Sequence, residues 1–165
     1  MKKYIYGEID GIKSGDIFKN RREIYDAGLH GSLQAGISGN QVTGSDAIVI
    51  SGGYIDDLDL GEAIIYTGQG GRDEKTGRQV ANQELVRGNA AIVTSCDLKI
   101  PIRVIRGSKS NSVFAPKEGY RYDGLYYCAR YWATFSVDGP LIWRFLLIHG
   151  EVKNSQFPNN EDIDL

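Results

Sequence analysis

The chain has 165 residues and a formal net charge of −2 at pH 7, with 41% hydrophobic and 24% charged residues. This length suits one domain with a substantial core, and the slightly acidic balance excludes nucleic-acid binding through an overall positive field. The 21 glycines against 4 prolines favour a globular, β-rich fold with many tight turns.

The first predicted element is a short helix at residues 21–27. Asn20 can cap its start, Gly28 can end it, and Ile24 and Ala27 would face the core. The next stretch, residues 36–45, is rich in glycine, serine and asparagine, and we expect it to form an exposed loop.

Two short buried strands are predicted at residues 47–51 and 63–66, where branched side chains run together. They place Tyr54 and Tyr66 beside glycines, and Asp57 lies three residues after Tyr54. Aromatic faces, a carboxylate and a close backbone suit a planar, hydrogen-bonding ring such as a nucleobase. Tyrosines at strand edges and glycine turns are also ordinary structural features, so the spacing alone leaves both interpretations open.

The second half of the chain predicts more helix and strand. Residues 70–79 predict another exposed loop, and helical periodicity follows at residues 81–96, where Gly88 favours two short helices rather than one. Strand patterns return at residues 102–105, 124–132 and 141–148. We expect a mixed α/β, β-rich fold in which a twisted sheet closes into a barrel with flanking helices.

The domain is expected to span residues 1–150. Residues 151–165 lose the apolar pattern and end in acidic residues, which predicts an acidic tail or a linker. The start of the chain carries no apolar stretch long enough for a signal peptide, and nothing later predicts a membrane span. We therefore expect a cytoplasmic protein with no membrane partner.

Neither a metal site nor a cofactor is predicted. The two cysteines, Cys96 and Cys128, and the two histidines, His30 and His149, are far apart in the sequence and have no metal-ligand spacing. Basic residues do gather between residues 99 and 121, with Glu118 as the only acid among them. Such a cluster permits a local basic face, although an ordinary solvated surface has the same composition.

Six motifs in order together resemble the SRA domain, also called the YDG domain. They are Asp-Ala-Gly-Leu-His at 26–30, Gln-Ala-Gly-Ile at 34–37, Ser-Gly-Gly-Tyr at 51–54, Tyr-Thr-Gly-Gln-Gly-Gly-Arg-Asp at 66–73, Gly-Tyr-Arg-Tyr-Asp-Gly at 119–124 and Ile-Trp-Arg-Phe at 142–145. The similarity extends over residues 7–149 and is closest to the bacterial branch of the family.

The resemblance implies a PUA-like fold that binds duplex DNA containing 5-methylcytosine or 5-hydroxymethylcytosine and flips the modified base into a pocket. It further implies a bacterial, nucleoid-associated protein that gives specificity to modification-dependent restriction. The endonuclease would be an HNH-type domain absent from this chain, or a separate effector, so no catalytic residue is expected here.

The resemblance also implies roles for individual residues. Tyr54 and Tyr66 would stack on the two faces of the base, and Asp57 would accept a proton from its exocyclic amino group. The backbone of Thr67 and Gly68 would complete the contacts to the base edge. Ser51, Gly53 and Gln69 would lie near the carbon-5 substituent, and the polar groups at 51 and 69 motivate the hypothesis that hydroxymethylcytosine is accepted.

Two finger loops would enter the DNA. Gln34, next to Ala35, occupies the position of an intercalating residue that fills the gap left by the flipped base. The second finger would come from the loop containing Lys75, Arg78 and Gln79, where the sequence departs from the vertebrate Asn-Lys-Arg pattern. Candidate phosphate contacts are His30, Arg72, Arg103, Arg106 and Lys109; for His30, a role in stabilising its own loop is the alternative.

Two other functions stay open on the residues alone. A PUA-like RNA-binding module would also present a pocket in a β-rich fold. A base-acting enzyme could use Asp57 as its carboxylate, although no second acid or activated nucleophile stands at a matching position.

Overall fold

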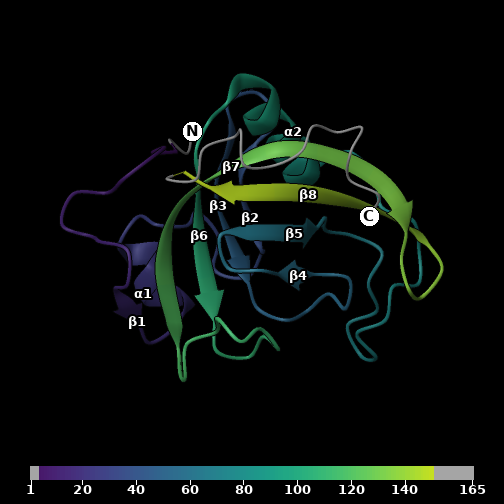
Figure 1. Ribbon diagram of the computed structural model, residues 1–165, viewed down its shortest axis with the longest axis horizontal. Coiled ribbons are helices and arrows are strands. Elements are labelled where there is room, and N and C mark those ends of the chain that lie inside the picture. The colour runs from purple at the N-terminus through teal and green to yellow at the C-terminus, as the bar shows by residue number, and fades with distance from the viewer. Residues whose placement is uncertain (1–3, 151–165) are drawn as a thin grey trace.

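The computed structural model describes residues 4–150. Within this range the chain forms one eight-stranded sheet and two helices (Figure 1). The elements are β1 (Ile17–Phe18), α1 (Arg21–Asp26), β2 (Ile37–Asn40), β3 (Gly44–Ile50), β4 (Leu58–Asp59), β5 (Ala63–Thr67), α2 (Arg87–Leu98), β6 (Ile102–Gly107), β7 (Tyr120–Phe135) and β8 (Leu141–His149). The predicted strands are all present, and the acidic segment at 151–165 lies outside the described residues.

The sheet is open rather than closed. Its strand order is β2-β3-β6-β7-β8-β5-β4, with β1 paired to the start of β7, and all neighbours are antiparallel except β3 and β6. The two ends of this path, β2 and β4, are not neighbours, so the prediction of a closed barrel was wrong. The sheet is coiled by the 16-residue strand β7, whose pairing with β8 shifts between Cys128 and Arg130, but β4 is too short to complete a ring.

Both helices form, but the second differs from its prediction. Asn20 caps α1 by accepting a hydrogen bond from the Glu23 N–H at 3.0 Å, and Ile24 is fully buried, as expected. Instead of two short helices at 81–96, the chain forms one helix, α2, that begins at Arg87. Gly88 lies in its first turn, where a Cβ would come within 2.9 Å of Ile37, so the glycine permits close packing on β2 rather than interrupting the helix.

The segment at residues 36–45 is not the exposed loop that its composition predicts. It forms β2, a tight turn and the start of β3, and both Ser38 and Ser45 are buried. Their burial is tolerated because the Ser45 hydroxyl donates to the Ser38 carbonyl oxygen at 2.7 Å and Ser95 in α2 accepts from the Ser45 N–H.

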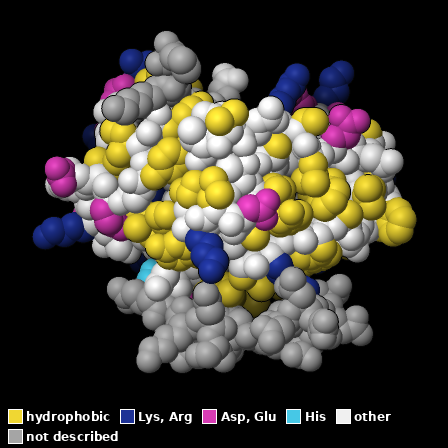
Figure 2. Space-filling model, turned by 90° about the horizontal axis from the view of Figure 1, so that it is seen from above, with side chains coloured by type: hydrophobic (Ala, Val, Ile, Leu, Met, Phe, Trp, Pro, Cys, Tyr) yellow, Lys and Arg dark blue, Asp and Glu magenta, His cyan; other side chains and the backbone are white. Residues whose placement is uncertain are grey.

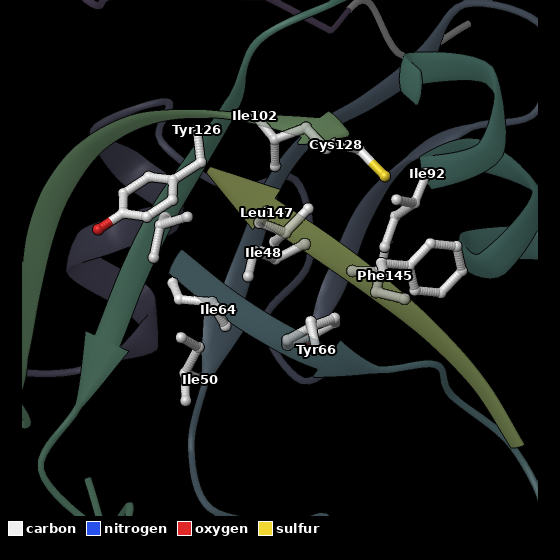
Figure 3. Packing of buried hydrophobic residues seen from close by; sticks show 12 residues of the cluster. Ile48, Ile50, Ile64, Tyr66, Ile92, Ile102, Tyr126, Cys128, Phe145 and Leu147 are labelled. Atoms are coloured by element: carbon white, nitrogen blue, oxygen red, sulfur yellow. The ribbon is translucent and has the colours of Figure 1, made fainter. Parts of the chain in front are cut away.

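The main core lies between the sheet and α2. Figure 3 shows Ile92 of α2 beside Phe145, with Tyr66, Ile64 and Leu147 pointing into the same interior. A second cluster packs α1 onto the sheet and includes Ile24, Leu29, Val49, Ile105 and Tyr122. The strand ends that lead to the candidate site are therefore fixed by packing on both sides.

Among residues 4–150, no helix is long and apolar enough to cross a membrane. In the same part of the chain, no group of three or more His, Cys, Asp and Glu side chains gathers into a possible metal site.

Candidate functional site

A cavity of about 480 Å³ lies where β3 runs into the loop before β4. Three of the predicted pocket residues, Gly53, Tyr54 and Asp57, line it. The loop after β6 contributes residues 110–113, which carry no motif and were not predicted. The remaining lining residues are Ile50, Gly52, Ile55, Leu58, Asp59, Arg72 and Gly77.

Tyr54 offers the aromatic surface of this cavity. Its ring is partly exposed, and its hydroxyl accepts a hydrogen bond from the Gly70 N–H at 3.2 Å. The Arg72 guanidinium lies 5.5 Å from the ring centroid, and a Cβ at Gly53 would come within 2.9 Å of Arg72 Nη1. The Arg72 side chain, from the loop after β5, thus lies over the Gly53–Tyr54 segment, where a glycine leaves room for its guanidinium.

Asp57 supplies a partly buried carboxylate. Its Oδ1 accepts a hydrogen bond from the Thr67 N–H at 2.7 Å, which ties the loop before β4 to the end of β5. Burial raises the pKa of Asp57 to about 6, and the hydrogen bond from the Thr67 N–H and the positive charge of Arg144 oppose this shift. The side chain can therefore accept hydrogen bonds at neutral pH, while its charge is costly to keep.

The two neighbouring carboxylates have structural partners. Asp56 accepts hydrogen bonds from the Ser136 hydroxyl at 2.6 Å and the Val137 N–H at 3.0 Å, which anchors the site to the β7–β8 turn. Asp59 borders the cavity, but both of its oxygens bind Arg106, at 2.7 and 2.8 Å. Asp57 is thus the acid of the three whose carboxylate is not committed to an arginine or to the β7–β8 turn.

The other predicted pocket residues are not part of this lining. Tyr66 is only 6% exposed, lies in the main core, and donates its hydroxyl to the Val49 carbonyl oxygen at 3.2 Å. Burial raises its pKa well above the usual value. Thr67 and Gly68 are buried. Ser51 is exposed, and although it precedes the lining residues Gly52 and Gly53 in the sequence, it does not line the cavity itself.

Gln69 lines a different cavity. This second space, of about 390 Å³, lies between the loop after β5 and the start of α2. Asn89 brackets the Gln69 backbone, accepting from its N–H at 2.8 Å and donating to its carbonyl oxygen at 3.0 Å. The structure therefore does not bring Gln69 and Ser51 together into one polar wall.

The two predicted finger loops are exposed, with one exception. Gln34, Ala35, Lys75 and Arg78 are exposed. Gln79 is only 5% exposed, and its amide donates to the carbonyl oxygens of Gly70 and Ala81 at 2.8 and 2.9 Å. The prediction of Gln79 as a finger residue was wrong, because its side chain holds the base of the loop instead.

Three of the predicted phosphate contacts are buried in the structure, so these predictions were wrong. Arg103 is fully buried and paired with Asp46 at 2.9 Å, and Arg106 is 3% exposed within its pair with Asp59. His30 is 2% exposed and bonded to its own loop. The sequence could not predict the burial of these side chains, because it does not show whether an arginine is exposed to solvent or paired with a distant carboxylate in the interior.

Arg72 and Lys109 remain as exposed candidates for phosphate contact. On the face shown in Figure 2, basic and acidic side chains are scattered among hydrophobic ones rather than gathered into a basic patch.

The described residues thus form a small β-rich domain with an open sheet and a cavity that has an aromatic face and a partly buried carboxylate. The family model described as the SAD/SRA domain matches residues 5–151. The chain belongs to that family, as the sequence motifs indicated.

Solved structures similar to this chain include the modification-dependent TagI restriction endonuclease, at 43% identity and a TM-score of 0.86. That match covers 91% of this chain and 54% of the other. The SUVH5 SRA domain bound to fully hydroxymethylated CG DNA matches at 36% identity and a TM-score of 0.76, covering 90% of this chain and 96% of that one.

Among curated proteins, the E3 ubiquitin-protein ligase UHRF1 of Xenopus laevis is 38% identical over 163 residues. The match covers 86% of this chain but 21% of the relative, so the chain corresponds to about a fifth of that protein.

Proposed function

We propose that this domain binds duplex DNA containing 5-methylcytosine or 5-hydroxymethylcytosine and takes the modified base into the Tyr54–Asp57 cavity. The observation that carries this proposal is the meeting of an aromatic ring, a carboxylate and a glycine backbone in one cavity. Relatives solved with methylated and hydroxymethylated DNA support the choice of ligand.

In this proposal Tyr54 stacks on the base and Asp57 accepts a proton from its exocyclic amino group. Flipping a base out of a duplex costs a few kcal/mol, which stacking and hydrogen bonding in the cavity and an inserted side chain offset. Gln34, exposed on its loop, is the candidate for that inserted side chain. A second stacking contact by Tyr66 requires its ring to be uncovered on binding, because it is buried in the free domain.

The proposed partner is supported by a further relative. The similarity to the modification-dependent TagI endonuclease supports a role in which this domain supplies specificity and an HNH-type nuclease domain or separate effector supplies cleavage. We place such a protein in the cytoplasm of a bacterium, associated with the nucleoid.

A base-acting enzyme is the alternative that one observation favours, since the pKa of Asp57 near 6 is suited to proton transfer. Replacement of Asp57 by asparagine separates the two functions. A binding module loses affinity for modified DNA, whereas an enzyme binds it and fails to turn it over. Competition between modified DNA and RNA tests the RNA-binding alternative.

The experiment is binding at fixed salt to one duplex sequence with cytosine, 5-methylcytosine or 5-hydroxymethylcytosine at a single position. The wild-type domain should prefer a modified duplex, and Tyr54→Ala and Asp57→Ala should remove the preference. Tyr127→Ala and Asp10→Ala, which change exposed residues outside the cavity, are the matched controls. Equal binding of the wild type to all three duplexes contradicts the proposal.

A further inference from the structure

The loop at residues 31–36, which carries Gln34, is held by hydrogen bonds from the side chain of Arg21. Arg21 is the first residue of α1, and its Nη2 donates to the carbonyl oxygens of Ser32 and Ala35, both at 2.7 Å. Its Nη1 lies 3.5 Å from the carbonyl oxygen of Gln34 itself. One planar guanidinium thus faces three backbone carbonyls of a short loop, a geometry that its fork of donors can satisfy at once.

His30 fastens both ends of the same loop. Its Nδ1 accepts a hydrogen bond from the Ser32 N–H at 3.0 Å, and its Nε2 lies 3.1 Å from the carbonyl oxygen of Gly36, to which it can donate. Burial, followed by the charge of Arg21, lowers the pKa of His30 to about 4. The ring is therefore neutral at pH 7, with one nitrogen as acceptor and the other as donor.

The loop is also closed internally. The Ser32 hydroxyl accepts hydrogen bonds from the backbone N–H groups of Gln34 at 3.2 Å and Ala35 at 2.9 Å. The backbone on both sides of Gln34 is thereby fixed, while the Gln34 side chain stays exposed.

The end of this loop lies close to Tyr66 in the main core. A Cβ on Gly36 would lie 2.8 Å from the Tyr66 hydroxyl oxygen, and the Gly36 carbonyl oxygen accepts from the Val49 N–H at 2.8 Å. Tyr66 in turn donates to the Val49 carbonyl oxygen. The loop and the end of β5 therefore pack tightly together, so a shift of one requires the other to move.

We propose that Arg21 and His30 are positioning residues that pre-organise the 31–36 loop, so that Gln34 enters the duplex when the base leaves it. This inference rests on the proposed function. Neither side chain needs to touch the DNA: both act by fixing the loop backbone before binding, which removes an ordering cost that a free loop would have to meet.

The test compares Arg21→Lys with Arg22→Lys. Both changes keep the positive charge, but only the first removes the planar fork that spans the loop carbonyls, since Arg22 is exposed and paired with Asp26. Binding is measured to duplexes with cytosine or 5-methylcytosine at one position, with 2-aminopurine beside it to report unstacking. We expect Arg21→Lys to lower the modified-over-unmodified affinity ratio about tenfold, the equivalent of one or two hydrogen bonds, and to reduce the fluorescence rise.

Binding of Arg21→Lys to unmodified DNA and its salt dependence should stay unchanged, because the charge is kept. A parallel loss for both duplexes would indicate a general structural defect and overturn the inference. Ser32→Ala, which removes the internal loop bonds but no core contact, is the second variant, and it should lower the same ratio even where Arg21→Lys does not fold.

Wild-type-like ratios and fluorescence in both Arg21→Lys and Ser32→Ala would also overturn the inference. A wild type with no preference for modified DNA would instead contradict the proposed function itself, so the two failures are distinct.

Discussion

At the scale of single residues, three acids within four positions do three different things. Asp56 ties the site to the β7–β8 turn, Asp59 is ion-paired with Arg106, and Asp57 lines the cavity with a pKa raised to about 6. Because the folded-state pKa of Asp57 lies above its usual value of 3.8, the ionised carboxylate destabilises the fold above pH 6, and this cost disappears as the pH falls toward 3.8. A side chain kept at such a cost is typical of a functional site.

The pH dependence of recognition follows from this shift. If the base is bound by ionised Asp57, the preference for modified DNA should hold above pH 6 and fall below it, by up to about tenfold per pH unit, because protonation removes the acceptor. The measurement is the ratio of affinities for modified and unmodified duplexes between pH 5 and 8, in which general electrostatic changes cancel. Asp57→Asn should give a low ratio that does not change with pH; a pH-independent ratio in the wild type would show that Asp57 is not the acceptor.

At the scale of elements, a buried ion-pair cluster joins β4 to the strands behind the cavity. The guanidinium of Arg106 in β6 binds both carboxylate oxygens of Asp59, and it also binds Asp123 of β7 at 2.9 Å. The side chains of Arg106 and Asp59 are only 4% and 5% exposed. β4 is only two residues long, so its backbone pairing alone gives little support. The ion pair therefore adds an anchor for β4 at the end of the loop that carries Tyr54 and Asp57, besides the hydrogen bonds made by Asp56 and Asp57.

Removing one partner of this cluster should therefore be costly. Asp59→Ala leaves Arg106 with a buried, partly unpaired charge, and we expect a loss of about 3–5 kcal/mol in the free energy of unfolding, measured by chemical denaturation. Asp26→Ala breaks the exposed Arg22–Asp26 pair and should cost at most about 1 kcal/mol. Similar losses for the two variants would mean that the buried pair does not hold β4.

At the scale of the whole molecule, the 165-residue chain carries a net charge of −2, which does not favour DNA binding through a broad positive field. Arg103 and Arg106, two of the predicted phosphate contacts, form buried ion pairs instead, so fewer cationic side chains are exposed for DNA binding. Affinity must then depend on a few exposed side chains together with the cavity, rather than on a broad positive surface.

The salt dependence of binding tests this. Affinity for DNA should fall with rising salt, and Arg72→Ala and Lys109→Ala should each reduce the slope of log affinity against log salt by about 1 if they contact phosphates. The control is Lys13→Ala, at an exposed lysine near the start of the chain. Unchanged slopes for Arg72→Ala and Lys109→Ala would remove these residues from the interface.

The sequence by itself determined the family, the strands β3, β5, β6, β7 and β8, the cap of α1 by Asn20, and the presence of Tyr54 and Asp57 at one site. These depend on local patterns: runs of branched residues, a capping side chain and motifs whose spacing is fixed along the chain. The sequence did not reveal which side chains are buried or which residues far apart in the chain are paired. Only the tertiary structure decided that Tyr66 lies in the core, that His30 and Arg103 are internal, that residues 110–113 border the cavity, and that the sheet stays open. The reason is physical: whether an arginine faces water or a carboxylate, and whether two strand edges meet, depends on residues far apart in the sequence that only packing brings together.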